Sequence, residues 1–106
     1  MSIRTVTLEP KQPWEIVPYQ LDFVKVLPEG EVISGVAFAI YLESDDPASP
    51  TDLASTMQYA SSYSDTIAQC DVQSGTDGVT YILRCRVTCS SGRRYEGEGK
   101  FLVKEN

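Results

Sequence analysis

The strongest constraint on the fold is a strict alternation of side-chain character near the C-terminus of the chain. From Val79 to Cys89 every second residue is apolar, and the residues between them are polar apart from Ile82. Side chains alternate across a β-strand with a period of two, so this pattern is typical of a strand with one buried face. Ser90-Ser91-Gly92 follows as a tight reversal, where the glycine suits a positive φ. The stretch therefore predicts a β-hairpin.

The return strand of this hairpin is expected to run from Arg93 to Val103. Its core-facing side chains are expected to be Tyr95, Phe101 and Val103, and its other face carries Arg94, Glu96, Glu98 and Lys100. Pairing of the two glutamates with Arg84 and Arg86 on the preceding strand explains these charges without catalysis. Gly97 and Gly99 leave room on the inward face. Either Tyr81 or another large side chain fills that room, or a partner backbone approaches there, and packing is the favoured interpretation.

A second signal is the order Asp77-Gly78 and then Tyr81 at the start of the same strand. A tyrosine just inside a strand, preceded by turn residues, is the pattern of a tyrosine corner, in which the phenol bonds to backbone a few residues upstream. The remaining strand candidates are residues 3–8, 19–24, 31–43 and 66–72. Residues 44–64 read as an exposed loop, with a short helix at 51–59 capped by Thr51.

The first 18 residues are expected to form a partly extended arm. Pro10, Pro13 and Pro18 each lack an amide donor, which excludes a central strand there. Trp14 lies inside this arm and is interpreted as a plug over one end of the core, or alternatively as an anchor for a partner. About seven short strands separated by turns predict an all-β chain: one immunoglobulin-like antiparallel β-sandwich spanning residues 1–106.

Composition limits the partners. The chain has 106 residues, enough for one domain, and a net charge of −6. That charge argues against nucleic acid and against an anionic membrane as partners. No apolar run approaches the roughly 18 residues of a membrane span, and the N-terminus lacks a signal-peptide core. We therefore expect synthesis in a cytoplasm.

No residue pattern points to an enzyme. Histidine is absent, which removes the usual activator of serine and cysteine nucleophiles.

The three cysteines, Cys70, Cys85 and Cys89, are interpreted as free buried thiols. Cys85 and Cys89 stand about 13 Å apart on one strand, too far for a disulfide, although Cys70 can meet either across strands. Asp45, Asp46 and Asp52 are carboxylates of the kind that hold calcium, but the prolines beside them favour a solvated loop. The sequence thus predicts no catalytic residue, no metal and no cofactor.

Five segments together resemble a known family. They are Pro10-Lys11-Gln12-Pro13, Tyr19–Phe23, Leu27–Ile33, Gly75–Tyr81 and Val87–Arg93. The chain resembles the small immunoglobulin-like virion proteins of tailed phages and prophages, of the fiber–tail adaptor type. The resemblance implies a non-enzymatic structural protein of the tail or head–tail region, made in the bacterial host cytoplasm and then carried in the virion.

The implied partners are other virion structural proteins, with a homo-oligomer left open. Contact would be made through strand edges, the N-terminal arm or the 44–64 loop. Trp14, Tyr59 and Tyr63 are the candidate contact residues, because exposed aromatic residues are enriched at interfaces. The alternative is a carbohydrate- or surface-binding sandwich, which would use the same three side chains as a platform.

Overall fold

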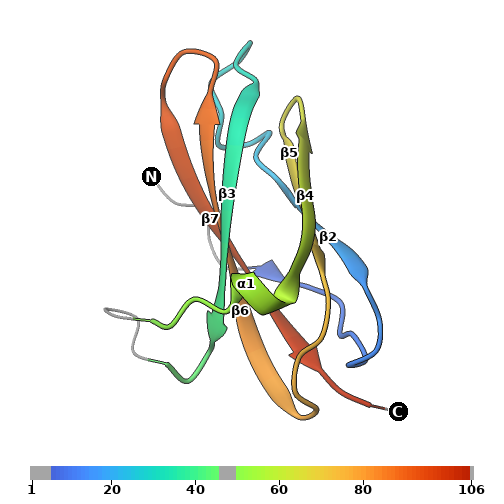
Figure 1. Cartoon of the computed structure of the whole chain (residues 1–106). Helices are drawn as coiled ribbons and strands as arrows, with labels where there is room; N and C mark the ends of the chain where they lie inside the picture. Colours follow the sequence, from blue (N-terminus) through green and yellow to red (C-terminus); the bar gives the residue numbers. More distant parts are fainter. Residues whose placement is uncertain (1–5, 46–49, 106) are drawn as a thin grey trace.

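The computed structural model describes residues 6–45 and 50–105, which form seven strands and one helix. The strands are β1 (Val6–Thr7), β2 (Val17–Asp22), β3 (Ile33–Leu42), β4 (Gln58–Ser64), β5 (Ile67–Val72), β6 (Val79–Cys89) and β7 (Arg94–Val103), and the helix is α1 (Ala54–Met57). One sheet has the order β1-β7-β6-β3 and the other has the order β2-β5-β4. The sheets form two layers (Figure 1), so the predicted all-β sandwich is confirmed.

The predicted hairpin is β6 and β7, paired antiparallel from Val79↔Val103 to Thr88↔Arg94. The alternate residues of β6 from Tyr81 to Cys89 are buried, as the sequence pattern requires. Ile82 faces the other way and is still only 9% exposed. It lies in a cross-strand row between Tyr41 and Lys100 on the outer face of the sheet.

The tyrosine corner is confirmed. The backbone N–H of Thr76 donates a 2.9 Å hydrogen bond to the phenol oxygen of Tyr81. The Tyr81 ring stacks on Phe101 at 5.5 Å between centroids, and Phe101 contacts Tyr19 of the opposite sheet at 5.0 Å. These three rings therefore join the two layers at one end of the core.

The buried side chains form two clusters. One contains Tyr19, Ile40, Met57, Cys70, Val72, Tyr81, Leu83, Phe101 and Val103. The other contains Leu21, Phe23, Leu27, Ile33, Ala68, Cys85, Val87 and Cys89. Leu8 and Phe38 pack against both, so each connects the two halves of the core.

The segment 44–64 differs from its prediction as a loop with a helix at 51–59. The helix covers only Ala54–Met57, and the predicted cap Thr51 lies outside it. Its N-cap residue Leu53 makes no side-chain cap, and the Ala54 N–H donates instead to the Asp52 carboxylate at 2.9 Å. Gln58–Ser64 forms the edge strand β4, paired with β5. The strand was missed because nearly all of its side chains are exposed, so no apolar alternation marks it.

The N-terminal arm closes one side of the sandwich. β1 pairs parallel to β7, with Val6 opposite Gly99, so the predicted strand at 3–8 is confirmed for Val6–Thr7, and residues 3–5 lie outside the described residues. Leu8 lies over Gly99, where an added Cβ would stand 2.5 Å from the Leu8 Cδ1 atom. The space beside Gly99 is therefore filled by packing, and the side chain that fills it is Leu8.

We expect Gly99→Ala to destabilise the fold by about 1–3 kcal/mol, because the new methyl group overlaps Leu8. Urea unfolding followed by tyrosine and tryptophan fluorescence measures this. Gly35→Ala is the matched control, because a Cβ there meets nothing within 4 Å. The double variant Leu8→Ala, Gly99→Ala should lose less stability than the sum of its single changes; strict additivity would contradict the contact.

Candidate functional site

The places where a partner could add a strand are the four sheet edges, which are β1, β2, β3 and β4. The β1 edge is only two residues long. The arm then follows β7: the Leu8 N–H donates to Lys100 O at 2.8 Å and the Lys11 N–H donates to Leu102 O at 3.0 Å. The C-terminal half of β7 is thus already paired on the edge that faces away from β6.

The β2 edge carries its own protection. The Phe23 N–H donates to Thr66 O. Backbone groups alternate in direction along an antiparallel strand, so the N–H and C=O groups of Tyr19, Leu21 and Phe23 point toward β5. The backbone groups of Pro18 therefore point away from β5. Pro18 therefore breaks no ladder bond and removes one donor from the free edge. This position agrees with the expectation that the proline-rich segment cannot be a central strand.

Lys11 holds the arm against the body, and the sequence analysis did not identify it. Its side chain is only 1% exposed. Its ammonium donates to Ser74 O at 2.6 Å, to Gln12 O at 2.7 Å and to Pro13 O at 3.4 Å. Burial lowers the pKa of this lysine, and the nearby Glu15 carboxylate opposes the shift. A buried cation is tolerated here because three carbonyl oxygens replace water.

The β3 edge is covered over part of its length. The Ile40 N–H donates to the Asp52 carboxylate at 3.1 Å, and the Leu53 N–H donates to Ile40 O at 2.6 Å. Asp52 therefore ties down the loop before α1. Asp45 likewise accepts from the Thr51 N–H at 2.9 Å, while Asp46 lies outside the described residues.

The β4 edge has no backbone hydrogen-bond partner among the described residues, although β3 lies beside it. The backbone C=O of Thr66 points toward β2, so the N–H and C=O groups of the odd-numbered residues of β5 point toward β4. The β4 residues paired with them are Ala60, Ser62 and Ser64. The N–H and C=O groups of Ser61 and Tyr63 consequently point away from the sheet. In the part of the chain that the structure describes, no hydrogen bond to these outward groups is found. β4 also carries no charged side chain and no proline.

Two of the three candidate contact residues, Tyr59 and Tyr63, lie on the β4 edge, whereas Trp14 lies in the turn before β2. Tyr59 and Tyr63 are 61% and 45% exposed on β4, and the Tyr63 hydroxyl donates to Ser34 O of β3 at 2.7 Å. Trp14 precedes β2, on the other edge of the three-stranded sheet, and is 93% exposed. The interpretation of Trp14 as a plug over the core is therefore wrong. The turn at Gln12–Glu15 turns its ring outward, while Lys11 occupies the buried position.

The cysteine thiols are unsuited to nucleophilic chemistry. All three are free and buried, as predicted. Burial raises the pKa of both Cys70 and Cys85 to about 12, and it also raises that of Cys89. Among the described residues no group of three or more metal-ligating side chains is found. The same residues include no helix with the length and apolarity to cross a membrane.

A protein-family model described as the podophage GP4 fiber-tail adaptor protein gp77 matches residues 11–101 of the chain. The chain belongs to this family. No curated protein matches it. Membership confirms the predicted class of phage tail adaptor, and it implies a structural protein of the virion that contacts other tail proteins.

The alternative of a carbohydrate- or surface-binding module stays a prediction. It requires Trp14, Tyr59 and Tyr63 to act together, and the sheet order places β5 between the strand that Trp14 precedes and the edge that carries the two tyrosines.

We expect Ellman's reagent to label none of the three cysteines in the native protein near pH 8 and all three in concentrated guanidinium chloride. The folded pKa of Cys70 and Cys85 lies above that of an unfolded thiol, about 9. Their contribution to stability is therefore complete below pH 9 and is lost as the pH rises toward 12. Rapid labelling of one native thiol at pH 8 would contradict this assignment.

Proposed function

We propose that the chain is a non-enzymatic adaptor that joins a fiber to the tail, and that one of its two contacts forms by strand addition at the β4 edge. It is made in the bacterial host cytoplasm and then incorporated into the virion. The observation that carries the proposal is the open edge of β4, in a chain whose family is that of fiber–tail adaptors.

Comparison of the edges supports β4 as the contact. β1 is short, the free edge of β2 contains Pro18, and β3 is covered at Ile40. Charges, prolines and short strands are the usual protection against edge pairing, and β4 has none of them. An edge left open in this way suits a partner that supplies an extended segment.

The mechanism follows from the backbone geometry. The outward N–H and C=O groups of Ser61 and Tyr63 would pair with the incoming segment, each bond contributing about 0.5–1.5 kcal/mol. Tyr59 and Tyr63 stand at the two ends of this stretch, about 13 Å apart along the strand. Their rings would cover the added segment and select its side chains.

The other contact is assigned to the edge preceded by Trp14. A tryptophan that is 93% exposed on a short turn is a large apolar group with few of its own neighbours. Such residues often supply a large share of the binding energy once a partner covers them. Two contacts on opposite edges of one sheet would let the adaptor bind fiber and tail at the same time.

We expect Ser61→Pro to weaken assembly at least tenfold while leaving the monomer folded. The Ser61 N–H faces outward, so the proline removes a donor for the partner without removing a bond to β5. The assay is co-sedimentation of the purified chain with tail particles made without it. Ser61→Ala, which keeps the outward N–H at the same position, is the matched control and should assemble normally. Equal loss in both variants would contradict pairing through the Ser61 N–H.

We expect Tyr59→Ala and Tyr63→Ala each to weaken the same assembly by about 1–2 kcal/mol, because each removes an exposed ring from the contact. Circular dichroism and urea unfolding should show folded monomers. Tyr63→Phe separates the roles of the ring and the hydroxyl group, since it removes only the bond to Ser34. Unchanged assembly in both alanine variants would remove the tyrosines from the proposed contact.

A further inference from the structure

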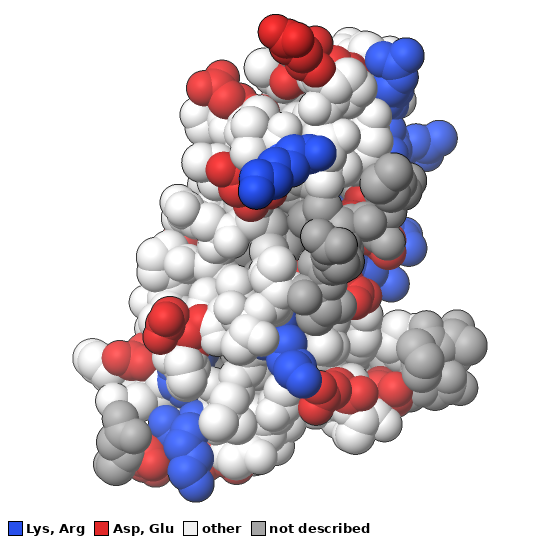
Figure 2. All heavy atoms as spheres, turned by 180° about the vertical axis from the view of Figure 1, so that it is seen from behind, with Lys and Arg blue, Asp and Glu red and all other residues white. Residues whose placement is uncertain are grey.

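The charges of this acidic chain are divided unevenly. Residues 79–103 carry five basic and two acidic side chains, a net charge of +3. The rest of the chain carries four basic and thirteen acidic side chains, a net charge of −9. Several basic side chains line the border of the molecule where the β6–β7 hairpin lies (Figure 2). The hairpin is thus a cationic region on an otherwise anionic protein.

The register of the sheet collects these charges on the outer face. Residues paired across strands share a face, and three successive rows are Gly35–Thr88–Arg94, Ala37–Arg86–Glu96 and Ala39–Arg84–Glu98. We call these nine residues the arginine face. Its three arginines lie on β6 and β7, and its three residues on β3 have minimal side chains. On the β3 side, these three rows of the arginine face therefore carry no large side chain.

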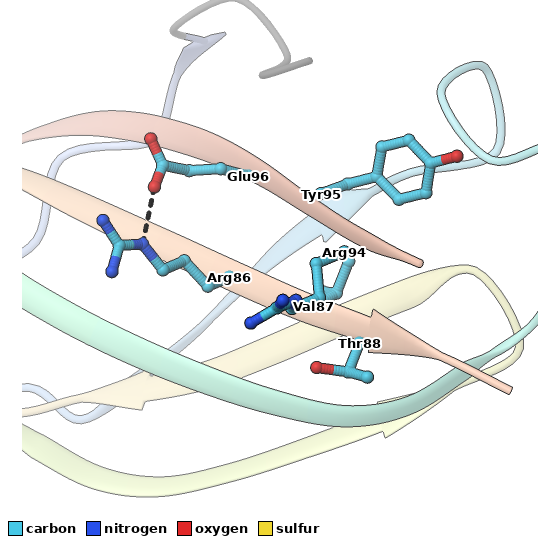
Figure 3. A pocket seen from close by; sticks show the side chains of 6 residues that line it. All are labelled: Arg86, Val87, Thr88, Arg94, Tyr95 and Glu96. Atoms are coloured by element: carbon cyan, nitrogen blue, oxygen red, sulfur yellow. Dashed lines mark hydrogen bonds and ion pairs between the residues drawn. The ribbon is translucent and has the colours of Figure 1, made fainter. Parts of the chain in front are cut away.

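A hollow of about 410 Å³ lies at the hairpin end of the arginine face. Arg86, Thr88, Arg94 and Glu96 line it, together with Val87 and Tyr95. Figure 3 shows Arg86 and Glu96 pointing toward each other from neighbouring strands, joined by a 2.6 Å ion pair. In the part of the chain that the structure describes, the Arg94 guanidinium has no hydrogen-bond or ion-pair partner.

Two arginines of the face, Arg84 and Arg86, are held in place by neighbouring side chains before any ligand arrives. Glu96 fixes Arg86, and the Arg84 guanidinium lies 5.8 Å from the centre of the Tyr41 ring. Tyr41 in turn donates from its hydroxyl to Glu98 at 2.8 Å. A guanidinium whose position is already fixed loses little freedom when it binds a carboxylate by two parallel bonds. Two of the three guanidinium groups of the face are therefore preorganised for an anionic group.

We propose that the arginine face is a further docking surface, which binds an acidic segment of a partner protein by placing a carboxylate between Arg94 and Arg86. An acidic segment is the expected occupant, because its negative carboxylates complement the three positive guanidinium groups. A nucleic-acid backbone fits less well, because Glu96 and Glu98 lie among the arginines and would repel successive phosphates. A single aspartate or glutamate side chain would meet Arg94 without meeting both glutamates.

This surface is independent of the proposed strand addition. It belongs to the β1-β7-β6-β3 sheet, whereas β4 belongs to the other sheet. A partner can occupy one without displacing the other. Failure of the Ser61→Pro prediction would leave the arginine face untouched, and the experiment below does not involve β4.

The test uses the ¹⁵N-labelled full chain and a hexaglutamate peptide at low ionic strength, with binding followed by NMR chemical shifts. We expect shift changes confined to residues 35–39, 84–88 and 94–98, and weakening with added salt. Arg94→Glu should weaken binding at least tenfold. Lys25→Glu is the matched control, because it makes the same charge change at an exposed lysine outside the hairpin, and it should change binding less than twofold.

Three outcomes would overturn the proposal. The first is the absence of any hexaglutamate binding at low salt. The second is equal weakening by Arg94→Glu and Lys25→Glu, which would show only a response to net charge. The third is tighter binding at the same residues by a single-stranded hexanucleotide than by hexaglutamate, which would assign the face to phosphate. Native thermal stability of both variants, measured alongside, separates lost binding from lost folding.

Discussion

The structure depends on burial of the alternate face of β6 between the two sheets. Five residues of this strand, from Tyr81 to Cys89, are nearly excluded from water and contribute to both core clusters. β6 has β7 on one side and β3 on the other, so both of its edges are paired over most of their length. Burial of apolar surface is the main favourable term in folding, and here it is concentrated on the strand that organises the larger sheet.

The two long sides of the sandwich differ in how far their backbone groups are already paired. On one side the N-terminal arm supplies backbone pairing to β7, fills the space beside Gly99 with Leu8, and buries the Lys11 ammonium against three carbonyl oxygens. On the other side β3 and β4 lie together, and most of β4 keeps its outward backbone groups available (Figure 1). A closed side gives the domain stability, and an open side leaves room for a partner.

This difference between the two sides suits a member of a fiber–tail adaptor family. An adaptor has to present separate surfaces for different neighbours, and a sandwich offers edges and sheet faces that do not overlap. The cysteines contribute only packing, since burial keeps their thiols protonated at neutral pH. The contacts that we propose for this chain use hydrogen bonds, aromatic side chains and charge.

Parts of the candidate surfaces could be read from the sequence and parts could not. The Arg86–Glu96 ion pair followed from alternation in two long strands, because the register of a hairpin is set by its turn. The strand β4 could not be found in this way, since a strand with no buried face has no apolar period. Lys11 could not be found either, because lysine is almost never fully buried and its three carbonyl partners come from segments as distant as Ser74.

The sequence by itself determined the all-β class, the β6–β7 hairpin, the tyrosine corner and the buried thiols, because each depends on local alternation or turn chemistry. Only the tertiary structure decided that Trp14 is exposed, that the arm closes one side, and that β4 is the open edge. Those features depend on which segments meet in space. Contacts between residues far apart in the chain leave no periodic signal in the sequence.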